Sequence, residues 1–170
     1  MTTPAIELHP MNKEQYEAYL KADLPRYAAE NVRAGYWSEA DAPAKAKETY
    51  ARYLPQGIDT PGQHLYVIRN QDEGQEVGIV WIGAQPGREA SAGFIYNLYI
   101  EEGFRRRGYA RATMLAIEEV ARAMGWSSLG LHVFGHNRAA RDLYESLGYE
   151  VRSMNMIKSI EEASEGSASR

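Results

Sequence analysis

Cysteine is absent from all 170 positions of the chain. This absence excludes disulfide bonds, zinc sites made of thiolates and a cysteine nucleophile. Long apolar runs are absent too, since no stretch approaches the ~20 consecutive apolar residues that a membrane-spanning helix needs. The first residues, Met1 to Glu7, lack the basic start and apolar run of a secretory signal. We therefore expect a cytoplasmic protein with no metal and no membrane contact.

A basic excess is also missing. The formal net charge is −4, so the chain as a whole repels polyanions, and nucleic-acid binding is not expected. The basic residues form one dense cluster at Arg105, Arg106 and Arg107, with Arg111 close behind. A small positive site on an acidic background suits a small phosphorylated ligand.

Hydrophobic periodicity and turn residues divide the chain into strands and helices. The predicted strands are Ile6–His9, Gln63–Arg69, Glu76–Ala84, Ala92–Ile100, Ser128–Phe134 and Tyr149–Lys158. The predicted helices run from Asn12 or Lys13 to about Ala34 with a break or bend near Pro25, from an N-cap at Ser38 to about Tyr53, from Gly108 to about Met124, and from Asn137 to Ser146.

The order of these elements predicts a mixed α/β fold. A helix separates the strand that ends at Ile100 from the strand that follows it, so these two strands should be parallel and joined by a right-handed crossover. Residues 1–160 should form a single domain. The tail, residues 161–170, lacks apolar anchors and is expected to be disordered.

The junction between the strand ending at Ile100 and the helix starting at Gly108 carries the clearest functional signal. A helix N-terminus leaves about four main-chain N–H groups unpaired and carries a partial positive charge. Gly108 lets the chain approach a ligand closely, Ala110 keeps the first turn open, and the arginines add charge. Such a turn can hold a diphosphate.

Two other phosphate-binding loops do not fit this junction. Gly103 and Gly108 have the glycine spacing of a nucleotide-triphosphate loop, but Tyr109 and Ala110 replace the required Lys and Ser or Thr. No Gly-x-Gly-x-x-Gly opens the helix, as a dinucleotide site would require. ATP and NAD are therefore not the expected ligands.

At these residues the sequence resembles the GNAT superfamily of N-acetyltransferases. The segment Arg105-Arg106-Arg107-Gly108-Tyr109-Ala110 matches the acetyl-CoA motif of that family, Gln/Arg-x-x-Gly-x-Gly/Ala. A second family motif matches Leu131 to Tyr149, including Asn137 and the run Leu-Tyr-Glu-Ser-Leu-Gly-Tyr. The resemblance covers Gln63 to Lys158 and implies a mixed central sheet whose β-α-β crossover forms the acetyl-CoA site.

The resemblance also implies a role for particular positions. Main-chain groups of Leu98, Tyr99 and Ile100 would pair with the pantetheine arm, which lies like an extra strand between diverging parallel strands. Asn137 would hydrogen-bond the cofactor, and Tyr144 would direct its hydroxyl at the thioester sulfur. The amides that would hold the diphosphate belong to Arg106, Arg107, Gly108, Tyr109, Ala110 and Arg111.

The general base is harder to identify. Many family members carry a glutamate where this chain has Ala92-Gly93-Phe94. Relatives resembling ribosomal-protein alanine acetyltransferases place a glutamate five residues before the asparagine, where His132 stands here. His132 is either a base or a histidine hydrogen-bonded within the sheet. His132 and His136 are four apart, but they do not share a helix face, so a metal site is not favoured.

The expected function is transfer of an acetyl group from acetyl-CoA to an amine by direct attack, with Tyr144 as acid and His132 as base. The alternative is a non-catalytic acyl-CoA-binding module that senses cofactor or contacts a partner. Either a monomer or a homodimer is compatible with the sequence, and the acceptor amine is not readable from it. Five aromatic residues in the first two helices and near them either line an acceptor pocket or belong to the core: Tyr27, Tyr36, Trp37, Tyr50 and Tyr53.

Overall fold

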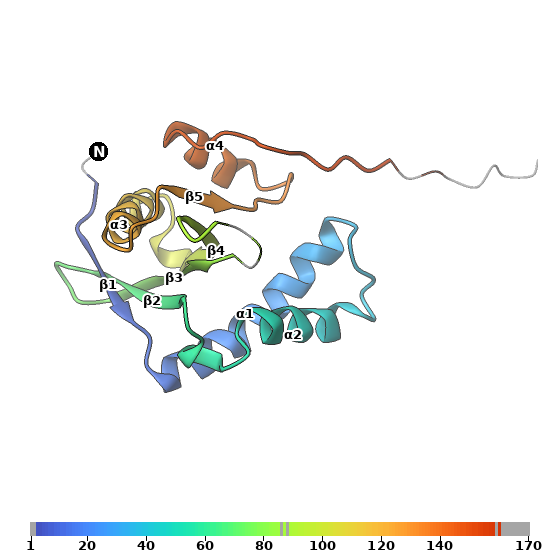
Figure 1. The fold of residues 1–170 in the computed structure, drawn as a ribbon, viewed down its shortest axis with the longest axis horizontal. Helices are drawn as coiled ribbons and strands as arrows, with labels where there is room; N and C mark the ends of the chain where they lie inside the picture. The colour runs from blue at the N-terminus through green and yellow to red at the C-terminus, as the bar shows by residue number, and fades with distance from the viewer. Residues whose placement is uncertain (1–2, 86, 88, 159, 161–170) are drawn as a thin grey trace, which may run out of the picture.

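The computed structural model describes residues 3–85, 87, 89–158 and 160. In these ranges one five-stranded sheet has the order β1-β2-β3-β4-β5, with helices packed on its faces (Figure 1). The strands are β1 (Ile6–Pro10), β2 (Gln63–Asn70), β3 (Glu76–Ala84), β4 (Ala92–Ile100) and β5 (Ser128–Leu131). The α-helices are α1 (Lys13–Arg33), α2 (Ala42–Tyr53), α3 (Tyr109–Ala123) and α4 (Arg138–Ser146). Short 3-10 turns cover Gly57–Asp59 and Glu102–Phe104.

The strand pairing confirms the mixed α/β sheet. Strands β1 to β4 are antiparallel neighbours, whereas β5 pairs parallel to β4 across a connection that contains α3. The predicted tail, residues 161–170, lies outside the described residues. None of the helices within the described ranges is long and apolar enough to cross a membrane.

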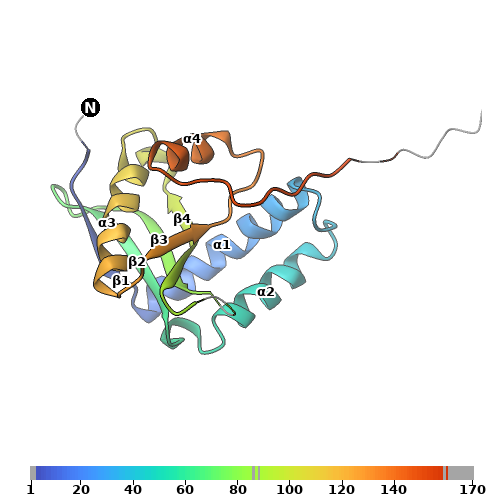
Figure 2. The same cartoon turned by 45° about the horizontal axis from the view of Figure 1, so that its top comes forward.

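Two apolar layers hold the helices to the sheet. Helices α1 and α2 cover one face and α3 the other, as Figure 2 shows. One cluster joins α3 to the sheet through Met114 and Ile117, both fully buried. The other joins α1 and α2 to the opposite face through Tyr19, Tyr50 and Trp81. Burying such side chains stabilises the fold by roughly 1.5–3 kcal/mol each.

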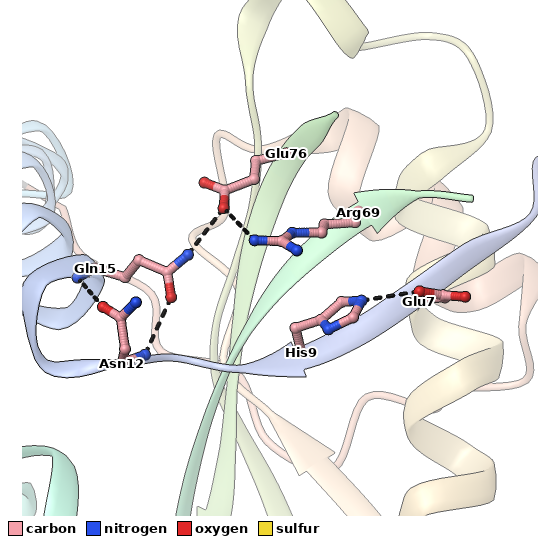
Figure 3. A network of polar contacts seen from close by, with 6 residues as sticks. All are labelled: Glu7, His9, Asn12, Gln15, Arg69 and Glu76. Carbon is pink, nitrogen blue, oxygen red and sulfur yellow. Dashed lines mark hydrogen bonds and ion pairs between the residues drawn. The ribbon is translucent and has the colours of Figure 1, made fainter. Parts of the chain in front are cut away.

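Helix α1 begins with a capping box. The Asn12 side chain accepts from the main-chain N–H of Gln15, and the Gln15 side chain accepts from the N–H of Asn12. The Gln15 amide also donates to Glu76 on β3, which pairs with Arg69 on β2 (Figure 3). The start of α1 is therefore tied to the sheet, and the helix, for which a break or bend near Pro25 is predicted, continues through Pro25 as one element.

Helix α2 starts later than expected. The N-cap is Asp41 rather than Ser38, and Pro43 lies in the first turn, where a missing N–H costs nothing. The Ser38 hydroxyl instead accepts from the Asp41 N–H and donates to the Asp41 carboxylate. Ser38 thus closes the turn that precedes the helix.

The predicted last strand is wrong. Residues 149–158 form no strand, and every residue from 150 to 158 is exposed. A strand exists only where its main-chain groups pair with another strand, and this extended segment leaves the body of the molecule after α4 (Figure 1). Strand β5 is also shorter than expected, because the chain turns away after Leu131 to form a turn at Phe134–Asn137.

Candidate active site

Strands β4 and β5 pair only along the first half of β4 and then diverge. Their parallel pairing ends at Ile95 and Leu131, so β4 continues to Ile100 without β5 beside it. At the parting point Tyr96 is an extra residue opposite β3, which makes a β-bulge. The strand edge beyond the bulge is therefore open on the β5 side.

The open stretch contains the three residues predicted to meet the pantetheine arm. Leu98, Tyr99 and Ile100 pair with β3 along their other edge. The Ile100 carbonyl already accepts a hydrogen bond from Arg105 Nε at 2.9 Å. The main-chain groups of Leu98 and Tyr99 are therefore better placed than those of Ile100 to pair with an extended ligand.

The loop from this strand to α3 contains two residues with a positive φ. Arg106 (φ 63°) and Gly108 (φ 85°) both adopt the left-handed region, which costs a residue with a side chain about 1–2 kcal/mol. A left-handed residue beside a right-handed one can turn successive N–H groups toward one point, where an anion can bind. Helix α3 then starts at Tyr109 with no side-chain cap and no acid in its first turn.

The other predicted cofactor residues have visible structural roles. Tyr109 is buried and its hydroxyl accepts from Asn70 Nδ2 at 2.9 Å. Arg111 donates to the Ser146 hydroxyl at the end of α4, and Asn137 caps α4 by accepting from the Ala140 N–H. A Cβ on Gly108 would stand 3.0 Å from Pro4 Cδ, so a side chain there meets the N-terminal segment first.

The two predicted catalytic residues line one cavity. His132 follows β5 and Tyr144 lies on α4, and both border an open hollow of about 1400 Å³. Tyr144 also packs against the cluster beneath α3, so it is partly a core residue. The predicted phosphate residues do not line this cavity. The acid and base candidates therefore border the same hollow, and Arg111 of the phosphate loop reaches the end of α4, the helix that carries Tyr144.

Burial shifts both candidates toward the uncharged form. Desolvation lowers the pKa of the His132 imidazole below its usual value of 6.5, so the ring is neutral at pH 7. Desolvation raises the pKa of the Tyr144 hydroxyl above 10, so it keeps its proton at that pH. A neutral imidazole can accept a proton and a protonated phenol can donate one.

A histidine–carboxylate contact beside His132 was not predicted. His136 bonds to Glu30 on α1 through its Nε2 atom, which joins the turn after β5 to the first helix. The rings of His132, Phe134 and His136 follow one another along the chain with centroids 5.1 and 5.6 Å apart. Through its bond to His136, Glu30 therefore holds the end of these three contacting rings, of which His132 borders the cavity.

A buried carboxylate on α1 was also missed. Asp23 is 5% exposed and accepts from the Tyr50 hydroxyl on α2 and from Asn97 Nδ2 on β4, the latter at 2.6 Å. Arg26 pairs with its second oxygen at 3.0 Å, and Asn97 also donates to the Tyr19 hydroxyl. The network holds both helices to the bulge. Asp23 and Asn97 are 74 positions apart, so no local motif joins them.

The aromatic residues left open by the sequence are mostly core. Tyr50 packs on Tyr27 and Trp81 with ring centroids 5.5 Å apart, and Tyr27 meets Trp37 edge-on. Tyr53 packs on Tyr96 of the bulge. Of the five candidates, Tyr36 borders the cavity and is 43% exposed.

The sequence is similar to those of known proteins over most of its length. The model of the family described as "Acetyltransferase (GNAT) family" matches residues 25–149. The Bacillus subtilis protein named "Uncharacterized N-acetyltransferase YycN" is 38% identical over 155 residues, covering 91% of this chain and 99% of that protein. A second protein of that organism, YdgE, has the same description and is 33% identical over 92% of this chain and 99% of its own length.

Solved structures give the same answer for the fold. The crystal structure of YycN superposes with a TM-score of 0.87 at 37% identity, covering 93% of this chain and all of that chain. The structure of AAC(6')-Iy in complex with a CoA-containing bisubstrate analog has a TM-score of 0.55 at 14% identity and covers 92% of this chain and 99% of that one. At that identity the similarity concerns the fold alone.

Proposed function

Because this chain belongs to the GNAT family of acetyltransferases, and so to the acyltransferase enzymes, we propose that it moves the acetyl group of acetyl-CoA to a primary amine. The observation that carries the proposal is the open edge of β4 leading into the uncapped N-terminus of α3. An extended pantetheine arm would lie along Leu98 and Tyr99, and its diphosphate would face the amides of residues 106–111.

The proposed reaction is a direct attack. The amine nitrogen forms a bond to the thioester carbonyl carbon and gives up a proton, the C–S bond breaks, and the thiolate takes a proton from Tyr144. His132, neutral at pH 7, accepts the proton from nitrogen. Bulk water restores both groups. No covalent enzyme intermediate is needed, and the chain has no cysteine to form one.

For the acceptor we propose a chemical class and not a single compound. The bound bisubstrate analog in AAC(6')-Iy is CoA-S-monomethyl-acetylneamine, and another similar structure is that of a ribosomal-protein-alanine N-acetyltransferase. We infer a small amine or the amine of a peptide, entering on the side of α1 where His132 and Tyr36 border the cavity.

A panel of amines tests this function. Purified protein, acetyl-CoA and single amines, including polyamines, amino sugars, amino acids and short peptides, are incubated while free thiol is measured. We expect thiol release above the rate without protein for at least one class, with the acetylated amine seen by mass spectrometry. Binding of acetyl-CoA with no turnover of any class would favour the alternative, a cofactor-sensing module.

Replacing His132 with glutamine tests the base. Glutamine is close in size and hydrogen-bonds, but it takes up no proton near neutral pH. We expect kcat/KM at pH 7 to fall about 10-fold and not further, because water can still accept the proton from the amine nitrogen, although less effectively. The wild-type rate should decline as the pH falls through the pKa of His132, which lies below 6.5, and this acidic limb should flatten in the variant.

The shape of the profile decides the assignment. A packing defect would lower the rate equally at every pH. An acidic limb that survives in His132→Gln would mean that another group, or an amine already deprotonated in solution, supplies the base.

A further inference from the structure

The N-terminus of α3 depends on contacts from other elements to stay in place. Its N-cap is Gly108, which has no side chain to hold the first turn. Main-chain N–H groups bind an anion well only where they are already in position, because ordering a loop on binding costs affinity. The amides of residues 106–111 can therefore serve a diphosphate only if the start of α3 is fixed beforehand.

Tyr109 links the start of α3 to the rest of the fold. It is the first residue of the helix, it is buried, and it belongs to the cluster that packs α3 on the sheet. Its ring meets the ring of Phe104 edge-on, with centroids 5.9 Å apart. Phe104 ends the 3-10 turn before the arginines, so these two rings bracket residues 105–108. The Tyr109 hydroxyl extends this anchor to β2, because it accepts a hydrogen bond from Asn70 Nδ2 at 2.9 Å.

Asn70 is itself fixed at the end of β2. It is buried, its main-chain N–H donates to the Gln75 carbonyl at 2.9 Å, and its carbonyl accepts from the Gly74 N–H at 2.8 Å. Its side-chain Oδ1 accepts from the Asp72 N–H, also at 2.8 Å. A main-chain N–H can only donate, so Oδ1 must face Asp72 and the NH₂ group must face Tyr109. The amide therefore cannot flip without losing both of its bonds.

The same end of the sheet also contacts Gly108. The residue after Asn70, Gln71, donates its N–H to the Ala5 carbonyl at 3.1 Å. Pro4 comes directly before Ala5, and its Cδ atom would lie 3.0 Å from a Cβ on Gly108. Residues 4–5 and 70–71 therefore form one support next to the start of α3, with Asn70 as the member that bonds to the helix.

We propose that Asn70 is a positioning residue for acetyl-CoA, and that it acts by fixing Tyr109 and with it the amides at the start of α3. The inference rests on the proposed binding of the diphosphate at residues 106–111. Asn70 lies 39 positions before Tyr109 and outside the motif at residues 105–110, so the motif does not reveal it. Its effect is confined to the part of the ligand that these amides hold, and the acetyl transfer itself is unaffected.

Titration calorimetry with acetyl-CoA gives the first test. Tyr109→Phe keeps the ring and removes the hydroxyl, and we expect the Kd to rise about 10-fold because the unpaired Asn70 amide loosens the loop. Asn70→Leu, close in size but unable to donate, should give a similar rise, and the double variant should lose no more than either single one. Tyr66→Phe is the control, since Tyr66 packs against the same core cluster from β2 and its hydroxyl makes no hydrogen bond within the described ranges. Its Kd should stay within about twofold of wild type. Circular dichroism checks that each variant is folded.

A donor without a diphosphate separates positioning from general damage. With acetyl-CoA, kcat/KM should fall about 10-fold in Tyr109→Phe through KM alone, whereas with S-acetylpantetheine it should equal that of wild type. Equal losses with both donors, additive losses in the double variant, or an unchanged Kd in Tyr109→Phe would overturn the role of Asn70. A wild-type protein that binds acetyl-CoA but acetylates no amine would contradict the proposed reaction alone, because calorimetry still decides whether Asn70 positions the loop.

Discussion

Replacing Tyr144 with phenylalanine is expected to lower kcat about 100-fold while the Kd of acetyl-CoA changes little. Phenylalanine keeps the ring that packs beside α3 and removes only the hydroxyl. Because desolvation raises the pKa of Tyr144 above 10, the hydroxyl is protonated throughout the neutral range. Any loss of rate from its ionisation should therefore appear only above pH 10.

Tyr149 provides the matched control for this experiment. Its ring lies 5.9 Å from that of Tyr144, it borders the same cavity, and burial raises its pKa to about 12. Tyr149→Phe removes the corresponding hydroxyl from a neighbouring ring that borders the same cavity and should leave kcat within about threefold of wild type. Equal effects of the two substitutions, or a normal kcat in Tyr144→Phe, would return Tyr144 to a packing role.

Arg106→Asp should raise the Kd of acetyl-CoA about 100-fold at low salt. A charge-assisted hydrogen bond from the Arg106 side chain to the diphosphate would contribute about 1.5–3 kcal/mol, and the aspartate that replaces it would also repel the diphosphate. Aspartate tolerates the left-handed region better than most residues, so the φ of 63° at this position is not the source of the loss. Titration calorimetry at two salt concentrations measures the effect, which should shrink as screening increases.

The other end of the same helix supplies the control. Arg122 lies in the last turn of α3 and its side chain is 60% exposed. A helix of 15 residues is about 22 Å long, so Arg122→Glu makes the same kind of charge change about two screening lengths away at the higher salt concentration, about 0.1 M. An equal loss of affinity in both variants would mean that only the net charge matters and that the diphosphate does not sit at residues 106–111.

Much of the fold was readable because its signals are local. The apolar face of α3 and the alternation in β2 follow from short windows, and a helix between β4 and β5 requires them to be parallel. The family motifs then placed Tyr144 and His132, which line one cavity in the structure. Their catalytic roles stay predictions until the variants are measured.

The errors arise where distant parts of the chain decide the outcome. Residues 149–158 have strand-like composition, but a strand also needs an edge within reach, and α4 directs this segment away from β5. The N-cap of α2 is Asp41 rather than Ser38, because the serine hydroxyl closes the preceding turn. The contact of Glu30 with His136 spans 106 positions, a separation that no sequence window covers.

The carboxylate of Asp23 on α1 bonds to α2 and to β4, so these three elements depend on one another. One way to change the acceptor would be to replace α1 and α2 with the two helices of a relative. The new helices would then need a carboxylate at position 23 and a tyrosine at position 50, and they would have to match the amide at position 97. Helices from a relative that lacks these groups would leave a buried charge or amide without a hydrogen-bond partner, which costs about 3–5 kcal/mol for the charge. New acceptors in this lineage should therefore arise by replacing residues at the exposed rim, such as Tyr36, before the helices themselves diverge.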